Sequence, residues 1–218
     1  MNYILFGPPG AGKGTHASRL METLKIAHIS TGDIFRDEVK FGSSLGKKVS
    51  DYLNRGALVP DEVVNEVMKK WINKIGGAQG FILDGYPRTI EQAKALEKIA
   101  KIDAIVQLVV PEWVIIERLS NRRICRNCGA IYNIKYFPKP KMDSKCDKCG
   151  AEIYQRQDDK AEVISERLKV YEKQTQPLTD FYKKRGVKFV TVESNRVDEP
   201  IEAVSQKILD NLKKAELM

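Results

Sequence analysis

The stretch ILFGPPGAGKGTH, from Ile4 to His16, decides how the rest of this sequence is interpreted. The apolar run 3–6 predicts a short buried strand, and a loop rich in glycine and proline follows it with a single lysine, Lys13. The spacing comes close to the pattern G-x-x-x-x-G-K-[ST], although a glycine stands directly after the lysine and Thr15 comes one position later. The stretch therefore predicts a strand, a glycine-rich loop and the start of a helix.

Such a loop can bind phosphate. Glycines allow successive backbone N–H groups to turn inward around phosphate oxygens, the lysine adds a positive charge, and a helix N-terminus favours anions. The alternative, a plain turn between two elements, fits the strand–loop–helix context less well. We therefore expect the loop to bind the phosphates of a nucleotide, which leaves the reaction open.

The composition, with 42% hydrophobic and 30% charged residues, is that of a globular protein. A length of 218 residues suffices for one main core with small insertions. No apolar stretch reaches the roughly 20 residues of a membrane span, so we expect no membrane association. The strand follows Met1 and Asn2 directly, which predicts no signal peptide and a cytoplasmic, reducing compartment. The net charge of +8 suits nucleic acid or small polyphosphates, and the absence of a long basic run favours polyphosphates.

Short apolar runs alternate with helical patterns along the chain. Proline and capping residues mark helix starts at Pro60, Thr89 and Pro177, and apolar residues at helical spacing predict another helix over 161–176. This alternation predicts an α/β fold with parallel strands and helices on both faces, in which ligands bind at the carboxyl ends of the strands. The five predicted strands are residues 3–6, 27–29, 81–83, 104–110 and 188–192.

All four cysteines lie in one region with little apolar periodicity, residues 122–159. Cys125 with Cys128 and Cys146 with Cys149 form two Cys-x-x-Cys pairs that are 17 residues apart, and a glycine follows each pair. Each pair offers two thiolates from one tight turn, as a tetrahedral four-thiolate zinc site needs. The alternatives are two disulfides or four separate thiols, and a reducing compartment disfavours disulfides. Because four cysteines close the ligand shell, we expect a structural metal. The bound ion could be zinc, iron or cobalt.

A second informative stretch is FILDGYPRTIEQ, residues 81–92. Asp84 ends a buried strand, where enzymes with such a phosphate loop place the carboxylate that orients the water shell of Mg²⁺. Arg88 follows four positions later and is suited to a second phosphate, and Gln92 lies one helical turn further on. Taken alone, Asp84 is also explained by turn capping and Arg88 by a surface charge, but together they favour a phosphate site.

In these and further motifs, the sequence resembles the adenylate kinases over essentially its whole length. The motifs are GPPGAGKGT, ISTGDIFR, ALVPDEVV, FILDGYPRT, ERLSNRRICRNCGAIY, YQRQDDK and RLKVYEKQTQPL. The combination is specific, and the four cysteines are similar to those of the long-lid bacterial type, which has a zinc site in its lid. The resemblance implies a P-loop core with a five-stranded parallel sheet over residues 1–29, 60–121 and 160–218, a small helical AMP-binding insertion at 30–59 and a metal-binding lid at 122–159.

The resemblance also implies an activity and the residues that carry it. The reaction would be reversible in-line phosphoryl transfer, ATP + AMP giving two ADP, which serves adenine nucleotide homeostasis. It implies Mg²⁺ bound with ATP, structural Zn²⁺, a monomer, and ATP, AMP and ADP as partners. The implied catalytic residues are Lys13, Asp84, Arg88, Arg122, Arg156 and Arg167. The implied ATP-binding residues are Gly10, Ala11, Gly12, Lys13, Gly14, Thr15, Arg118, Arg122, Ile131, Tyr132 and Arg196. The implied AMP-binding residues are Thr31, Arg36, Ala57, Leu58, Val59, Gly85, Tyr86, Pro87, Arg88, Gln92, Arg156 and Arg167, with Gln92 reading the adenine edge.

Three other functions remain as alternatives. Kinases for UMP or CMP resemble this chain but have a much shorter lid, and GTP-using relatives usually lack the cysteines. A nucleic-acid-binding protein could use the cysteine pairs and the positive charge, although acidic residues are mixed with the lysines of that region. A metal-stabilised scaffold leaves the phosphate loop and the arginines unexplained. His16 stands where the family often has glutamine, and we interpret it as a tolerated variant rather than a catalytic residue.

Overall fold

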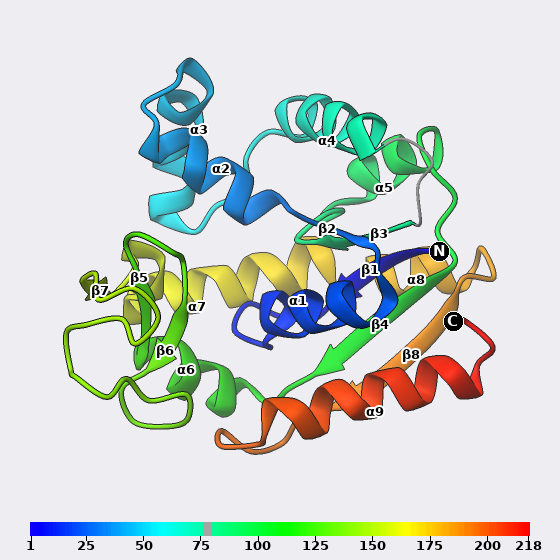
Figure 1. Ribbon diagram of the computed structural model, residues 1–218. Helices are drawn as coiled ribbons and strands as arrows, with labels where there is room; N and C mark the ends of the chain where they lie inside the picture. The colour runs from blue at the N-terminus through cyan, green and yellow to red at the C-terminus, as the bar shows by residue number, and fades with distance from the viewer. Residues whose placement is uncertain (76–79) are drawn as a thin grey trace.

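The computed structural model describes residues 1–75 and 80–218 and centres on a sheet of five parallel strands (Figure 1). The strand order is β2-β3-β1-β4-β8, which puts the first strand in the middle of the sheet. All five strands predicted from the sequence are present, with ends that differ by one residue, so the α/β fold is confirmed. The strands are β1 (Asn2–Phe6), β2 (Ala27–Ser30), β3 (Phe81–Asp84), β4 (Ala104–Val109) and β8 (Lys188–Glu193).

Helices cover both faces of this sheet because side chains alternate along each strand. In β1, Tyr3 and Leu5 belong to a core with residues of α1, α6, α7 and α9, whereas Ile4 and Phe6 belong to a core with residues of α4, α5 and α8. These helices are α1 (Lys13–Leu24), α4 (Asp61–Ile75), α5 (Ile90–Glu97), α6 (Glu112–Ser120), α7 (Ala161–Val170), α8 (Leu178–Lys183) and α9 (Ile201–Lys214).

One predicted helix is interrupted. The pattern over 161–176 predicts a regular helix, but α7 ends at Val170 and a π-helical turn, η2 (Tyr171–Thr175), follows it. Thr175 lies in this turn, and its Oγ1 donates to the carbonyl oxygen of Arg88, in the segment that follows β3, at 2.9 Å. Such turns occur frequently at functional sites.

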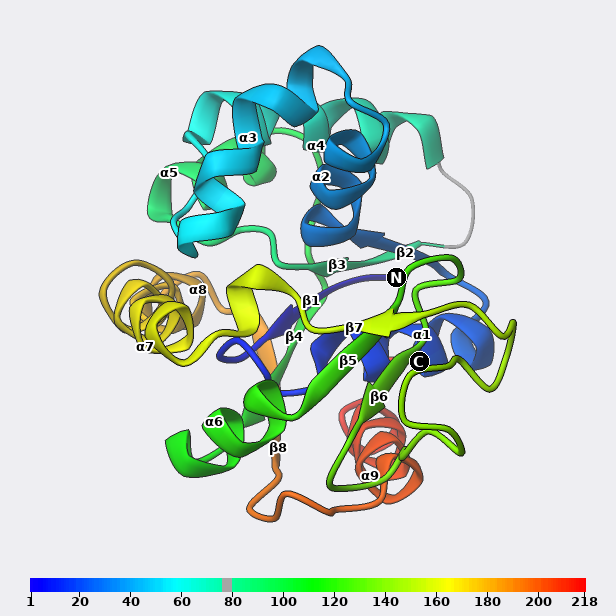
Figure 2. The same cartoon turned by 90° about the vertical axis from the view of Figure 1, so that its left-hand side faces the viewer.

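Two smaller groups of elements stand at the carboxyl ends of the strands. Between β2 and α4 lie α2 (Thr31–Lys40) and α3 (Ser44–Arg55). The second group is an antiparallel sheet of β6 (Ile131–Asn133), β5 (Arg122–Cys125) and β7 (Ile153–Tyr154), followed by the 3₁₀ turn η1 (Gln157–Asp159). Figure 2 shows this small sheet facing the viewer, below α2 and α3. In the part of the chain that the structure describes, no helix is long and apolar enough to cross a membrane.

Candidate active site

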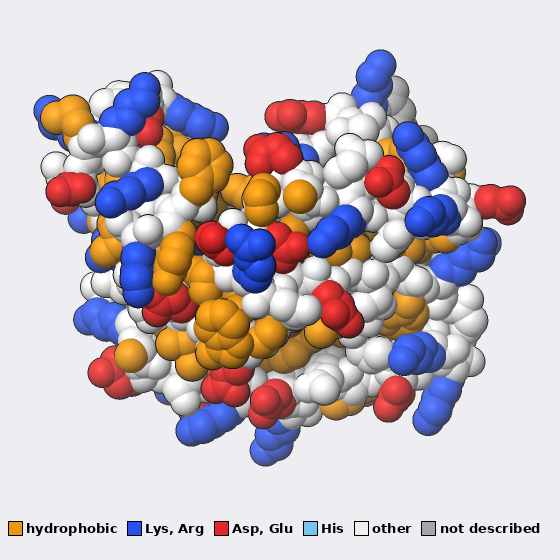
Figure 3. Space-filling model, turned by 90° about the horizontal axis from the view of Figure 1, so that it is seen from below, with side chains coloured by type: hydrophobic (Ala, Val, Ile, Leu, Met, Phe, Trp, Pro, Cys, Tyr) orange, Lys and Arg blue, Asp and Glu red, His pale blue; other side chains and the backbone are white. Residues whose placement is uncertain are grey.

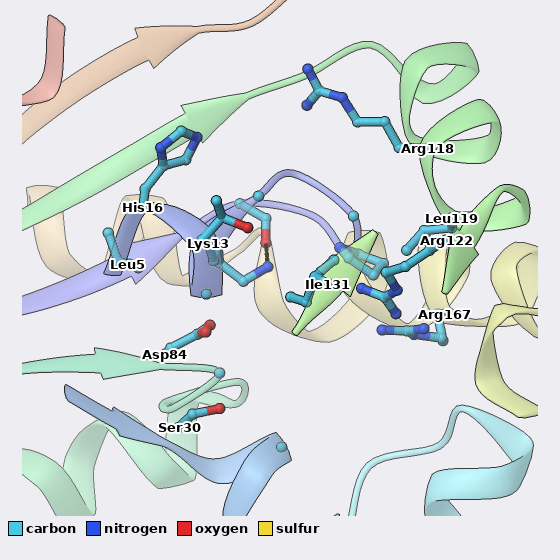
Figure 4. A pocket seen from close by; sticks show the side chains of 18 of the residues that line it. Leu5, Lys13, His16, Ser30, Asp84, Arg118, Leu119, Arg122, Ile131 and Arg167 are labelled. Carbon is cyan, nitrogen blue, oxygen red and sulfur yellow. Dashed lines mark hydrogen bonds between the residues drawn. The ribbon is translucent and has the colours of Figure 1, made fainter. Parts of the chain in front are cut away.

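The glycine-rich loop runs from the end of β1 to the start of α1 and surrounds the Lys13 side chain (Figure 4). Gly10 and Gly12 have φ values of 81° and 92°, which glycine adopts without strain. Lys13 Nζ donates to the carbonyl oxygens of Gly7 at 2.7 Å and Pro8 at 2.8 Å, and burial lowers the pKa of this lysine to about 8. The ammonium group is therefore held within the loop, next to a helix N-terminus that favours anions.

A cavity of about 290 Å³ adjoins the loop and gathers basic side chains from distant parts of the chain. Gly10, Gly12, Gly14 and Thr15 line it on the loop side. Figure 4 shows Arg122 and Arg167 next to each other and pointing toward the loop. The seven basic residues that line the cavity are Lys13, Arg36, Arg88, Arg118, Arg122, Arg156 and Arg167. Of the cations implied by the resemblance, all but Arg196 thus meet around one space, although their roles stay predictions.

These cations are close enough to repel one another. Burial first, and then the charge of Arg167, lowers the pKa of Arg88 to about 10. Burial first, and then the charge of Arg36, lowers the pKa of Arg156 to about 10. Clustered cations with lowered pKa values are a feature of functional sites, because a bound polyanion relieves their repulsion.

Two carboxylates that the sequence motifs do not single out as site residues hold the arginines in place. Asp159 is fully buried and accepts from Arg122 Nε at 2.8 Å, and its Oδ1 lies 3.4 Å from Arg167 Nη1. Asp158 Oδ2 lies 2.9 Å from the same Arg167 nitrogen. Burial acts to raise the pKa of Asp158, but the surrounding arginines, Arg167 foremost, outweigh it and the pKa is lowered. The only sequence signal for this pair was the acidic dipeptide in YQRQDDK, close to Arg156.

Asp84 lies at the carboxyl end of β3, paired with Leu5 in β1, directly beside the phosphate loop. A Cβ at position 14 would lie 3.3 Å from Asp84 Oδ2, so a larger residue there would crowd the carboxylate. His28 Nε2 is buried, makes no hydrogen bond to the described residues and lies 3.7 Å from the same oxygen. One carboxylate with waters and substrate phosphates is the usual ligand set of Mg²⁺, so Asp84 fits the expected ion.

A second, smaller hollow of about 30 Å³ adjoins the first on the side of α2 and α3. Thr31 Oγ1 donates to the carbonyl oxygen of Gly85 at 2.9 Å, which joins α2 to the loop after β3. Of the residues implied for AMP, those that line this hollow are Thr31, Ala57, Leu58, Val59, Gly85, Arg88 and Gln92. Pro87 lines the larger cavity.

Gln92 and Tyr86 are more deeply embedded than the sequence motifs suggest. The side chain of Gln92, 1% exposed, accepts from the Arg88 backbone N–H at 2.7 Å and donates to Asp61 Oδ1 at 2.7 Å. A hydrogen bond to an adenine edge would use the second N–H or the second oxygen lone pair. The Tyr86 hydroxyl donates to Asn65 Oδ1 at 2.9 Å, and its side chain lines neither hollow.

At the opposite end of the larger cavity, Arg118 is fixed to the loop after β8. Its Nη2 donates to Ser194 Oγ at 2.9 Å and to the carbonyl oxygen of Arg196 at 2.7 Å. The Arg196 side chain is exposed, pairs with Asp198 and does not line the cavity, so Arg196 contributes only the carbonyl oxygen that holds Arg118. Ile131 and Tyr132 line the cavity from β6.

Two residues of the loop region point to the core rather than to open space. Ala11 is 1% exposed and belongs to the core beneath α1 and α6, outside the lining of the cavity. His16 lines the cavity, but its Nδ1 is hydrogen-bonded to Ser205 Oγ of α9 at 2.9 Å. Burial lowers the pKa of His16 to about 4, so the imidazole is neutral at physiological pH.

The four cysteines form a candidate metal centre. Their Sγ atoms all lie within 4.8 Å of one another, and the Cys125–Cys149 and Cys128–Cys146 distances are 3.4 and 3.5 Å. Tetrahedral Zn–S bonds of about 2.3 Å require S···S distances of about 3.8 Å, so the cluster fits such an ion. The glycine after each pair has a φ of about 70°, and its N–H donates to the carbonyl oxygen of the first cysteine.

Comparison with known proteins agrees with this geometry. The family model described as adenylate kinase matches residues 5–187. The adenylate kinase of Archaeoglobus fulgidus is 49% identical over 216 residues, which cover 95% of this chain and 99% of that protein. Those of Thermosipho melanesiensis and Caldicellulosiruptor bescii are 50% and 51% identical, over 94% and 86% of this chain and 97% and 89% of theirs. The chain belongs to the adenylate kinase family.

Proposed function

We propose that this chain performs the adenylate kinase reaction, reversible transfer of a phosphoryl group between ATP and AMP to give two ADP, in the cavity beside Lys13. The observation that carries the proposal is the convergence of seven cations on that one cavity. Two nucleotides bound end to end bring several phosphate charges together, and arginine guanidinium groups bind phosphate oxygens in pairs while remaining charged.

Phosphoryl transfer requires positioning and charge stabilisation rather than a covalent intermediate. Lys13 and the loop N–H groups would hold the outer phosphates of ATP, and Arg88, Arg156 and Arg167 would hold the acceptor phosphate and the group in transit. Mg²⁺, held through water by Asp84, would neutralise part of the phosphate charge. The carboxylates of Asp158 and of the buried Asp159 keep the arginines oriented before substrate arrives.

The hollow lined by Leu58 and Gln92 would take the base of AMP, and the end near Arg118 would take the base of ATP. We propose residues 30–59 as the acceptor-binding insertion and 122–159 as a lid, on a core of residues 1–29, 60–121 and 160–218. Lys40 Nζ donates to the carbonyl oxygen of Arg126 at 3.3 Å, so the two insertions touch each other. Their contact supports a closed arrangement that keeps water, the competing phosphoryl acceptor, away from the site.

The remaining assignments follow from the same site. A monomer is the proposed active unit, as the resemblance to the family implies. Zinc is the proposed ion of the four-cysteine centre, where it would have a structural role because no ligand position stays open. Thiolate ligands of this kind persist in a reducing compartment, which supports the cytoplasm as the location.

Nucleic-acid binding is the second candidate, suggested by the charge of +8. On the face shown in Figure 3, however, lysines and arginines are interspersed with acidic side chains and form no continuous basic surface. Most of the arginines with lowered pKa values face the cavity instead. This distribution favours small polyphosphates over a nucleic-acid backbone.

The decisive experiment is a nucleotide panel, with ATP or GTP as donor and AMP, UMP, CMP or GMP as acceptor. We expect the highest kcat/KM for ATP with AMP. A preference for a pyrimidine acceptor would overturn the acceptor assignment. A gel shift with duplex and single-stranded DNA under the same buffer, at two salt concentrations, tests the second candidate, and we expect no shift.

A further inference from the structure

Strand β6 lies between the nucleotide cavity and the four-cysteine centre. Ile131, Tyr132 and Asn133 all line the cavity. Asn133 pairs with Arg122 in the neighbouring strand, and its Nδ2 lies 3.3 Å from the carbonyl oxygen of Arg118. This three-residue strand is therefore in contact with two of the arginines on the donor side of the cavity.

The Tyr132 side chain reaches from this strand to the cysteines. It is 5% exposed, and its hydroxyl oxygen lies 3.3 Å from Cys146 Sγ. The same oxygen accepts the backbone N–H of Asp147 at 2.9 Å. Because that N–H is the donor, the single hydroxyl hydrogen is available for the sulfur of Cys146. One hydroxyl thus holds both the sulfur and the backbone of the second cysteine pair.

We propose that Tyr132 is a positioning residue that joins the metal centre to the donor end of the nucleotide cavity. Its hydroxyl holds Cys146 in the place that a tetrahedral ion requires, and the strand to which it belongs forms part of the cavity wall. Partners of metal ligands orient those ligands, and their loss typically weakens metal binding by about 10- to 100-fold. Because one residue contacts both sites, we expect metal and nucleotide binding to be coupled, and any factor by which one strengthens the other applies in both directions. The cavity half of this proposal rests on the function proposed above, whereas the metal half does not.

The test of the metal half compares two variants of the full-length protein. Tyr132→Phe keeps the ring and removes the hydroxyl. Tyr136→Phe is the matched control, because Tyr136 lines the same cavity but donates its hydroxyl to Glu117 Oε1 at 3.0 Å rather than to a sulfur. Zinc affinity is measured by competition with a chromophoric chelator. We expect Tyr132→Phe to bind zinc at least 10-fold more weakly and Tyr136→Phe to match the parent, whereas equal affinities in all three proteins would overturn the proposal.

The test of the coupling uses the unmodified protein first, so it does not depend on how a variant folds. Zinc affinity is measured with and without saturating ADP, and we expect ADP to tighten zinc binding several-fold. In Tyr132→Phe this effect should be lost. An affinity of the parent for zinc that ADP leaves unchanged would overturn the link between the sites. A failure of the nucleotide panel with intact ADP coupling would instead count against the proposed reaction alone.

Discussion

Arg122 and Asp159 form a two-pronged ion pair in which Arg122 Nε donates to Asp159 Oδ2 at 2.8 Å and Nη2 contacts Oδ1. The two residues stand at the first and last positions of the proposed lid, and the carboxylate is completely buried. Arg122 is thereby aimed at the cavity while the ends of the lid are tied together. Pairs of this geometry combine charge with a fixed orientation, which is what transfer between two polyanions requires.

The first prediction concerns the charge of Lys13. Replacing it in Lys13→Met keeps most of the side-chain volume but removes the ammonium group from the phosphates. We expect turnover under saturating ATP and AMP to fall by at least about 100-fold, as for other charge-stabilising donors. The circular dichroism spectrum should match the parent, because the loop lies at the surface of the core. An unchanged turnover number would refute the role of Lys13.

The second prediction concerns pH. Burial lowers the pKa of Lys13 to about 8, so in the free enzyme the lysine loses its charge as the pH rises through that value. Values of kcat/KM for ATP report the free enzyme and should fall above about pH 8, whereas kcat should persist to higher pH because bound phosphates stabilise the charged lysine. Steady-state profiles from pH 6 to 10 provide the measurement. Parallel profiles for the two quantities would contradict this assignment.

The third prediction separates the two nucleotide sides. Arg88 lies at the hollow assigned to AMP, whereas Arg122 lies in β5 beside the strand assigned to ATP. Arg88→Lys should raise the KM for AMP more than that for ATP, and Arg122→Lys should do the reverse. Both should lower kcat, since lysine keeps the charge but not the planar fork. If both variants weakened only ATP binding, the assignment of the two sides would be wrong.

The fourth prediction concerns acid stability. The pKa of His16 is about 4 in the folded protein, against an unfolded value of about 6.5, because the imidazole is buried. The unfolded chain therefore binds this proton first, so the contribution of His16 is fully present above pH 6.5 and is lost as the pH falls toward 4. The slope is at most about 1.4 kcal/mol per pH unit. Urea unfolding from pH 7 to 4.5 should show this slope in the parent but not in His16→Gln, and equal slopes would exclude His16 as its source.

The fifth prediction concerns the cysteine centre. Its hydrophobic cluster contains four buried residues, two of them proposed ligands: Cys125, Tyr132, Cys146 and Ile153. Such a small core needs a metal to hold the roughly 38 residues of the insertion. Cys128→Ser and Cys146→Ser should lose metal and melt at lower temperature, yet keep measurable activity at moderate temperature. Mass spectrometry, a thermal melt and an assay provide the readouts.

Two results would contradict this structural role of the metal. Metal-free protein with an unchanged melting temperature would show that the ion contributes nothing to stability. Metal-free protein that is fully folded at the assay temperature but inactive would indicate a catalytic ion, against the closed ligand shell.

The sequence predicted the elements whose signals are local. Each of the five strands is an apolar run bounded by turn residues, and the Thr89 cap is a local signal that the structure reproduces, because Thr89 Oγ1 accepts from the Gln92 N–H at 3.1 Å. In a capping box, Gln92 would also accept from the backbone N–H of Thr89, and that reciprocal contact does not form. Gln92 Oε1 accepts from the Arg88 N–H instead, while its Nε2 donates to Asp61, a partner 31 positions away that fixes the orientation of the amide.

By itself the sequence determined the parallel strands, the phosphate loop after the first of them and the two cysteine pairs, because period, turn chemistry and ligand spacing act over a few neighbouring residues. Only the tertiary structure decided which charges meet. Arg118 is bound to a loop more than 70 positions away, and Arg122 to a carboxylate 37 positions away, and no local spacing encodes either pairing. Such pairs depend on how the insertions pack over the sheet, where burial makes an unpaired charge costly and so selects the partner.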